Sequence, residues 1–152
     1  MPVGYSLLGG RNQTPLTDDE IRRAVYAFAN LDPNVNVRHD PDRRTAFRVA
    51  RDESGKDFGE VVFGPDIYPG ASVVDPNSGL SLLAAAAHEL THYYRWVDKT
   101  HLDEPAHEHL DEALTSLEAI CRYERLLGAI DVRLLASDAI LRIRLYVNSI
   151  GG

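Results

Sequence analysis

Two histidines and a glutamate within five residues, His88-Glu89-Leu90-Thr91-His92, form the HExxH pattern. Residues four apart lie one turn above each other on a helix, so both imidazoles can point at one metal ion. Glu89 lies one step around the helix from His88, where its carboxylate can reach a water on that metal instead of the metal itself. The spacing therefore predicts two metal ligands, His88 and His92, and a general base, Glu89.

The segment around this pattern has the composition of a buried helix. No Gly or Pro interrupts the chain from Ser81 to Val97, and residues 82–87 are apolar, with four alanines. Alanine is the strongest helix former. Two histidines four apart also occur on ordinary amphipathic helices, but burying them beside a charged glutamate is costly unless they have partners. We therefore favour a metal site over a plain structural helix.

A third ligand is expected, because a catalytic zinc site usually has three protein ligands and an open position for water. Glu112 follows His92 by 20 residues, on the next predicted helix. Glu108 lies one turn earlier on the same helix, so a shift in helix register would exchange the two. Other candidates close to these positions are His107, His109, Glu118 and Asp98. We favour Glu112.

The stretch Asp111-Glu112-Ala113-Leu114-Thr115-Ser116 resembles the gluzincin metallopeptidases, the thermolysin-like group. In that family a helix with the pattern N-E-A-x-S-D follows HExxH by about 20 residues. Glu112 matches the zinc glutamate, and Ala113 matches the small residue after it. Ser116 stands where the family has an aspartate that orients one zinc histidine, and a hydroxyl raises ligand basicity less than a carboxylate does.

This resemblance covers about a quarter of the chain, roughly residues 81–118. It implies a zinc ion held by His88, His92 and Glu112, and peptide-bond hydrolysis with Glu89 as general base. Asp98 occupies the place of a metzincin-type ligand, but such sites need a glycine three residues after the second histidine, where this chain has Arg95. At 152 residues the chain is closest in size to the minimal gluzincins, including short intracellular metallopeptidases associated with repressor cleavage.

The elements before the HExxH helix are predicted from caps and periodicity. Thr17 and Glu20 form a capping box, so a helix is expected from there to about Leu31, before Asp32-Pro33. From residue 34 to residue 74 the apolar period changes to two, which indicates three or four short strands. The last of these is a short strand at Val73-Val74, and turn-forming stretches between the strands favour short antiparallel connections.

Two further helices are expected after the HExxH helix. The first begins near Asp103-Glu104-Pro105 and ends before Gly128, and it carries Cys121 as a small buried apolar residue. The second runs from Asp131 to about Ser149. The fold class is therefore α+β: one zincin-like domain spanning 1–152, with a small antiparallel or mixed sheet packed on the HExxH helix, a second ligand helix and a C-terminal helix.

Substrate contacts are less constrained by the sequence. The segment from Val61 to Gly70 is a candidate edge strand above the cleft, which would offer backbone groups to an extended peptide. A donor for the developing oxyanion is also expected. The candidates are Tyr68, His101, His107, His109 and Tyr146.

The amino-acid composition argues against some classes of binding partner. The formal net charge is −7 and no basic stripe is present, which argues against nucleic acid or an anionic membrane as the main partner. The N-terminus lacks the features of a signal peptide, so a cytoplasmic location is expected. The expected substrate is a peptide or protein, and the apolar C-terminal helix is expected to pack as core or to meet a second subunit in a homo-oligomer. The alternative function is a zinc-binding regulatory or interaction domain without peptidase activity.

Overall fold

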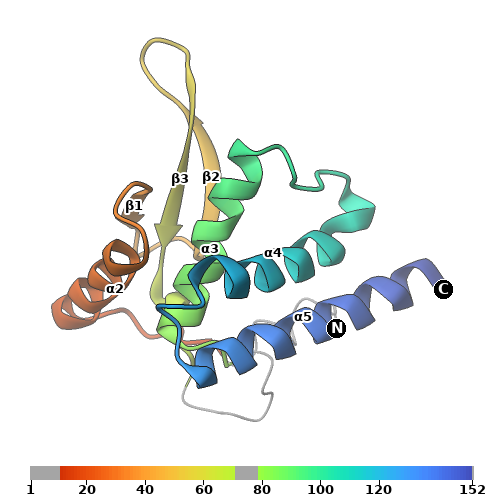
Figure 1. Ribbon diagram of the computed structural model, residues 1–152. Helices are drawn as coiled ribbons and strands as arrows, with labels where there is room; N and C mark the ends of the chain where they lie inside the picture. The colour runs from red at the N-terminus through yellow and green to blue at the C-terminus, as the bar shows by residue number, and fades with distance from the viewer. Residues whose placement is uncertain (1–10, 71–78, 152) are drawn as a thin grey trace.

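The computed structural model describes residues 11–70 and 79–151 of the chain. This part of the protein is α+β, with a three-stranded mixed sheet and four α-helices (Figure 1). The elements in chain order are α2 (Asp18–Leu31), β1 (Asn36–His39), β2 (Ala46–Arg51), β3 (Asp57–Phe63), the 3-10 turn η1 (Pro65–Ile67), α3 (Leu82–Val97), the 3-10 turn η3 (Pro105–His107), α4 (Glu108–Tyr123) and α5 (Ala129–Gly151). The expected strand at Val73-Val74 lies outside the described residues.

The predicted capping box begins α2. The Thr17 hydroxyl accepts from the backbone N–H of Glu20, and the Glu20 carboxylate accepts from the backbone N–H of Thr17. The helix ends at Leu31, before Asp32-Pro33. Phe28 and Leu31 are buried against the rest of the core. Both boundaries of this helix were predicted from the sequence.

The sheet has the order β1-β3-β2, with β1 parallel and β2 antiparallel to β3. The central strand is therefore β3, so the hypothesis that the segment from Val61 forms the edge above the cleft is wrong. The edge strand on that side is β2. Because β1 and β2 both pair with β3, their connection crosses the end of β3 instead of forming a hairpin. Gly64 allows this crossing, since a Cβ there would lie 1.8 Å from the carbonyl oxygen of Arg43.

Helix α3 lies at the centre of the molecule. The sheet and α2 lie on one side of it, and α4 and α5 on the other (Figure 1). Ala84 to Ala87 and Leu90 are all buried. Small alanine side chains let neighbouring helices and the sheet approach α3 closely, which produces close packing around the HExxH segment.

Helices α4 and α5 are an antiparallel pair with somewhat different bounds from those predicted. The expected helix to about Leu127 ends at Tyr123, and α5 begins at Ala129. The prediction that Cys121 is buried is wrong, because Cys121 is exposed. The buried face of α4 includes Ala113, Ser116 and Ala119, and Cys121 lies about 200° around the helix from Ala119.

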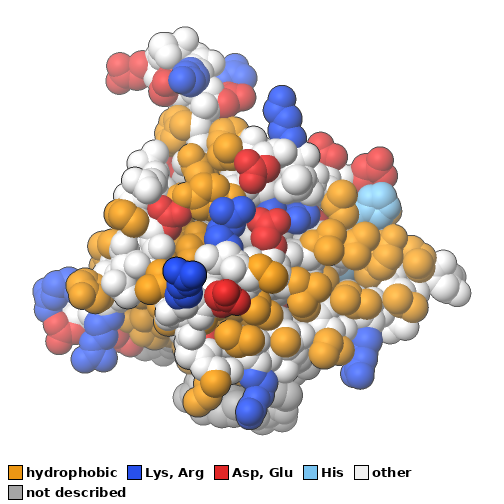
Figure 2. Space-filling view, in the orientation of Figure 1, with side chains coloured by type: hydrophobic (Ala, Val, Ile, Leu, Met, Phe, Trp, Pro, Cys, Tyr) orange, Lys and Arg blue, Asp and Glu red, His pale blue; other side chains and the backbone are white. Residues whose placement is uncertain are grey.

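Apolar side chains remain exposed on the same two helices, and Figure 2 shows them gathered over the region of α4 and α5. They include Leu114 and Leu117 on α4, and Ile140, Ile143, Val147 and Ile150 on α5. A homo-oligomer through α5 stays a prediction. None of the helices in the described ranges has the length and apolar character needed to cross a bilayer.

Candidate metal centre

The side chains of His88, His92 and Glu112 converge on one point. The two Nε2 atoms are 3.1 Å apart, and His88 Nε2 lies 2.7 Å from Glu112 Oε2. The Glu112 carboxylate also lies 3.2 Å from His92 Nε2. Among the described residues, these three form the group of His, Cys, Asp or Glu side chains that could hold a metal ion, with all ligand atoms within 4.8 Å of one another.

The histidines meet because they are four residues apart on α3, as the sequence predicts, but Glu112 depends on how α4 crosses α3. A buried ion pair next to the cluster joins the two helices where they cross. Arg95 Nη2 lies 2.7 Å from Asp111 Oδ1, and Arg95 Nη2 also donates to the carbonyl oxygen of Thr100. Asp111 directly precedes Glu112, so the ion pair connects the helix of the histidines to the residue beside the third candidate ligand.

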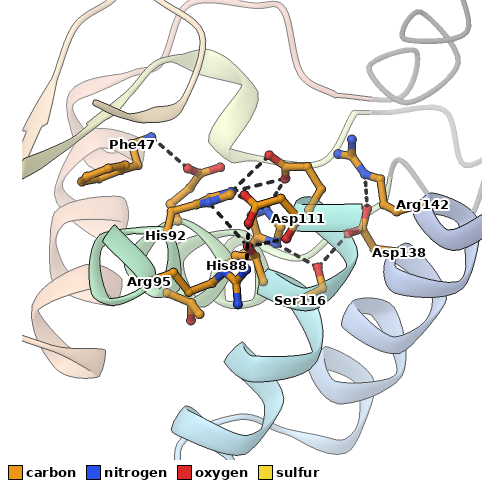
Figure 3. Close-up of polar contacts among 12 residues, drawn as sticks. Phe47, His88, His92, Arg95, Asp111, Ser116, Asp138 and Arg142 are labelled. Carbon is orange, nitrogen blue, oxygen red and sulfur yellow. Dashed lines mark hydrogen bonds and ion pairs between the residues drawn. The ribbon is translucent and has the colours of Figure 1, made fainter. Parts of the chain in front are cut away.

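A hydrogen-bonded chain lies behind His88 (Figure 3). His88 Nδ1 is 2.8 Å from Ser116 Oγ, and Ser116 Oγ donates to Asp138 Oδ2 on α5 at 2.7 Å. Because the Ser116 hydroxyl proton goes to Asp138, its oxygen accepts the Nδ1 proton of His88. In the neutral imidazole, this network leaves the lone pair of His88 on Nε2, the atom that faces Glu112. The side chains of His88, Ser116 and Asp138 are all buried.

His92 has a similar arrangement with a longer contact. Thr115 Oγ1 donates to the carbonyl oxygen of Asp111 at 2.7 Å and lies 3.5 Å from His92 Nδ1. The Nδ1 atoms of both histidines therefore lie against hydroxyl groups of α4. Since Thr115 Oγ1 has its proton on a carbonyl, it can only accept from the imidazole, and a neutral His92 that donates to it from Nδ1 has its lone pair on Nε2.

Glu89 belongs to the same helix but not to the cluster. Its Oε2 accepts a hydrogen bond of 3.1 Å from the backbone N–H of Phe47 on β2. Burial, partly opposed by the positive charge of His92, raises the pKa of the Glu89 carboxyl from 4.5 to about 7. A strand from the other side of the molecule therefore holds this carboxylate beside the histidines.

The pKa values of the two glutamates of the site are shifted in opposite directions. Burial also raises the pKa of Glu112, but when the metal-free histidines carry protons on Nε2, the charge and hydrogen bonds of His92 and His88 outweigh this effect and hold that pKa well below its usual value. Glu112 is therefore the anionic carboxylate of the pair in this structure, and Glu89 is the one whose proton is held near neutral pH. Such divergent environments are typical of sites in which two carboxylates have different roles.

The cluster opens into a cleft of about 710 Å³. One wall includes Thr45, Ala46 and Phe47 at the start of β2. The other wall includes Glu108 and His109 of α4, and Asp138 and Arg142 of α5. Clefts of this size are common at ligand sites.

The remaining sequence candidates divide into those inside and outside this cleft. Glu108 and His109 line it, but neither belongs to the three-residue cluster. The Tyr68 hydroxyl donates to the carbonyl oxygen of Glu20, so its proton is directed at α2 and not at the site.

The other candidates have partners elsewhere. His101 lies beside the carbonyl oxygen of Arg95, and the rings of His107 and Tyr146 contact each other. Glu118 and Asp98 pair with arginines, Glu118 with Arg95 and Arg122, and Asp98 with Arg122.

Sequence reasoning missed Asp138 and Arg142, which follow Glu112 by 26 and 30 residues in the C-terminal helix. A signal for them was present: two charged residues four apart in a helix otherwise rich in apolar side chains. It did not indicate which neighbour they meet.

Searches against protein-family models, curated proteins and solved structures find no match to this chain. The function of the protein is therefore inferred from the geometry of the site and from its motif.

Proposed function

We propose that the protein is a zinc-dependent peptidase of zincin-like fold that uses Glu89 as general base. The observation that carries this proposal is the position of Glu89: it lies beside a His-His-Glu cluster, outside it, and against an edge strand. A purely structural zinc site has no need of such a carboxylate and usually has four protein ligands. The HExxH motif with Glu112 on the following helix, which resembles gluzincins, supports the same assignment.

The donor set fits a divalent cation. When both imidazoles are neutral and donate from Nδ1 to Ser116 and Thr115, their lone pairs are on Nε2, so two imidazole lone pairs and a carboxylate face one another at about 3 Å. Such electron-pair donors repel each other unless a cation or a proton lies between them. Two imidazoles and one carboxylate are the ligand set of catalytic zinc sites.

His88, His92 and Glu112 would hold the zinc, which when bound supplies Lewis acidity for hydrolysis of an amide. Glu89 accepts the proton of the attacking water and delivers it to the leaving amine. In the metal-free site the pKa of this carboxyl lies close to neutral, and a bound cation would favour the carboxylate form, which is the form that accepts the water proton. The N–H of Phe47 keeps the carboxylate turned toward the cleft while the proton moves.

The edge of β2 is the proposed place for the peptide backbone. Thr45, Ala46 and Phe47 line the cleft at the start of this strand, and among the described residues β3 is the strand that pairs with it. An extended peptide can add to such an edge through main-chain hydrogen bonds, here through groups other than the N–H of Thr45 and of Phe47, which donate to Asp66 and Glu89. This docking would bring an amide of the substrate close to Glu89.

The test is a comparison of the parent protein with Glu89→Gln, both loaded with zinc. Zinc content by elemental analysis and far-UV circular dichroism should be unchanged in the variant, because the amide keeps the shape of the side chain and Glu89 is not in the cluster. Hydrolysis of a broad peptide library, read by mass spectrometry, should fall by about a hundredfold to ten-thousandfold.

Two results would contradict the proposal. Equal cleavage by parent and variant would remove Glu89 from the mechanism. Absence of cleavage by the zinc-loaded parent would favour a metal-binding domain without peptidase activity.

A further inference from the structure

The charged side chains of the cleft differ in how far they are already engaged. Asp66 accepts from the backbone N–H and the hydroxyl of Thr45. Arg11 donates to the carbonyl oxygens of Asp66, Ile67 and Leu80, which holds the segments on either side of residues 71–78 together. These residues build the wall of the cleft.

Arg142 is different. Its Nε lies 3.5 Å from Asp138 Oδ1, one turn earlier on α5, and the side chain is 21% exposed. No hydrogen bond joins its terminal Nη atoms to any residue in the described ranges. Within the described part of the chain, the guanidinium group therefore pairs with a carboxylate at one edge, and its terminal donors are unused.

Asp138 is the acidic partner of that guanidinium, although the contact is an ion pair and Arg142 Nε makes no hydrogen bond to a described residue. The other carboxylate oxygen of Asp138 accepts from Ser116, and Asp138 itself is 3% exposed, so the carboxylate has little freedom to move. In Figure 3 the two histidines lie between Phe47 and Arg142, which places Arg142 across the metal cluster from the wall that contacts Glu89. A cation at this place faces a substrate bound over the cluster from the opposite side.

We infer that Arg142 binds a carboxylate group of the peptide substrate. The planar guanidinium offers parallel N–H donors that match the two oxygens of a carboxylate. A partly buried cation with unused donors gains more from such a ligand than a fully solvated one would. The inference rests on the proposed peptidase function and names its substrate class: peptides with a carboxylate close to the scissile bond, from either an acidic side chain or a free C-terminus.

The experiment uses ligands that bind zinc without being cleaved. Four succinyl hydroxamate peptides share one sequence and combine a C-terminal acid or amide with an Asp or an Asn side chain. Their dissociation constants are measured by calorimetry on the zinc-loaded protein. The parent should bind at least one carboxylate form about tenfold to a hundredfold more tightly than the ligand with both groups neutral, as expected for a charge-assisted pair.

Variants assign this preference to one residue. In Arg142→Gln the ratio of the dissociation constants of the neutral and the carboxylate ligands should be close to one. Arg142→Lys keeps the charge but lacks the paired donors, so it should give an intermediate ratio. Arg144→Gln is the matched control, since Arg144 is exposed on the same helix and is not part of the cleft. It should keep the preference of the parent. The form of the ligand that carries the preference distinguishes a free C-terminus from an acidic side chain.

The inference fails if the parent binds charged and neutral ligands equally, or if both Arg142 variants keep the preference of the parent. A carboxylate preference in a protein that cleaves no peptide would overturn the peptidase proposal alone. No binding of any hydroxamate by the zinc-loaded parent would overturn both.

Discussion

Ser116 and Asp138 are joined by a buried hydrogen bond of 2.7 Å that connects α4 to α5 directly behind His88. The gluzincin pattern has an aspartate at the position of Ser116. In this protein the carboxylate comes instead from a different helix, with the serine hydroxyl as intermediary. His88 is thus oriented by a carboxylate after all, although not one that the motif contains.

Replacing Asp138 by Asn tests this arrangement. The amide still accepts from Ser116 but carries no charge, so it polarises the imidazole less. Zinc affinity should fall by about tenfold to a hundredfold, the usual effect of altering a group that orients a metal-bound histidine. Competition with a chromophoric chelator measures it. The double variant Ser116→Asp with Asp138→Ala, which brings a carboxylate directly to His88, should recover affinity, and an unchanged affinity in Asp138→Asn would show that the hydrogen-bonded chain has no effect on the metal.

Glu112 and Glu108 are a matched pair for testing the third ligand, since both are glutamates of α4 that line the cleft. Glu112→Gln should lose most of the bound zinc, because a neutral amide is a poor substitute for an anionic ligand. Glu108→Gln should retain it. Elemental analysis after dialysis decides between them, and the reverse order of zinc content would make Glu108 the ligand.

Arg95 is expected to matter for stability as much as for the site. Arg95→Met leaves the buried carboxylate of Asp111 without its cation, and breaking a buried pair in this way typically costs about 3–5 kcal/mol. The free energy of unfolding from urea titration of the metal-free protein measures the loss. The double variant Arg95→Met with Asp111→Asn should recover part of it, because no unpaired charge remains and the amide still accepts from the N–H of Leu102. A loss below about 1 kcal/mol in the single variant would mean that the pair does not hold α3 against α4.

The raised pKa of Glu89 predicts how the stability of the chelator-treated protein depends on pH. The folded state keeps the Glu89 proton up to about pH 7, whereas the unfolded state loses it near 4.5. The contribution of this group to stability is therefore fully present below pH 4.5 and is lost as the pH rises to 7. The loss is on the order of 3 kcal/mol.

In Glu89→Gln the side chain is a neutral amide that does not ionise between pH 5 and pH 8. The difference in free energy of unfolding, variant minus parent, should therefore increase as the pH rises from 5 to 8, because only the parent loses this contribution. Urea titration of both metal-free proteins measures it. Parallel curves for the two proteins would contradict the raised pKa.

The sequence alone predicted those features that depend on neighbouring residues of one helix or strand. The capping box of Thr17 and Glu20, the start of α2 and the shared direction of His88 and His92 all follow from spacing along one helix, because the geometry of a turn is the same in every protein. The α+β class and the short strands followed from the change of apolar period. Glu112 was favoured over Glu108 through the motif, and in the structure it is Glu112 that joins the histidines.

Only the tertiary structure decided how distant elements meet. It made β3 the central strand and β2 the edge, because strand order depends on which faces are buried against α3 and not on the turns between strands. It turned Cys121 outward, since the packing of α4 selects one face of a helix that has apolar residues on several. It also brought Asp138 to Ser116 and Arg142 to the cleft. Their positions are set by the packing of α4 and α5, a contact between segments over 20 residues apart for which periodicity holds no information.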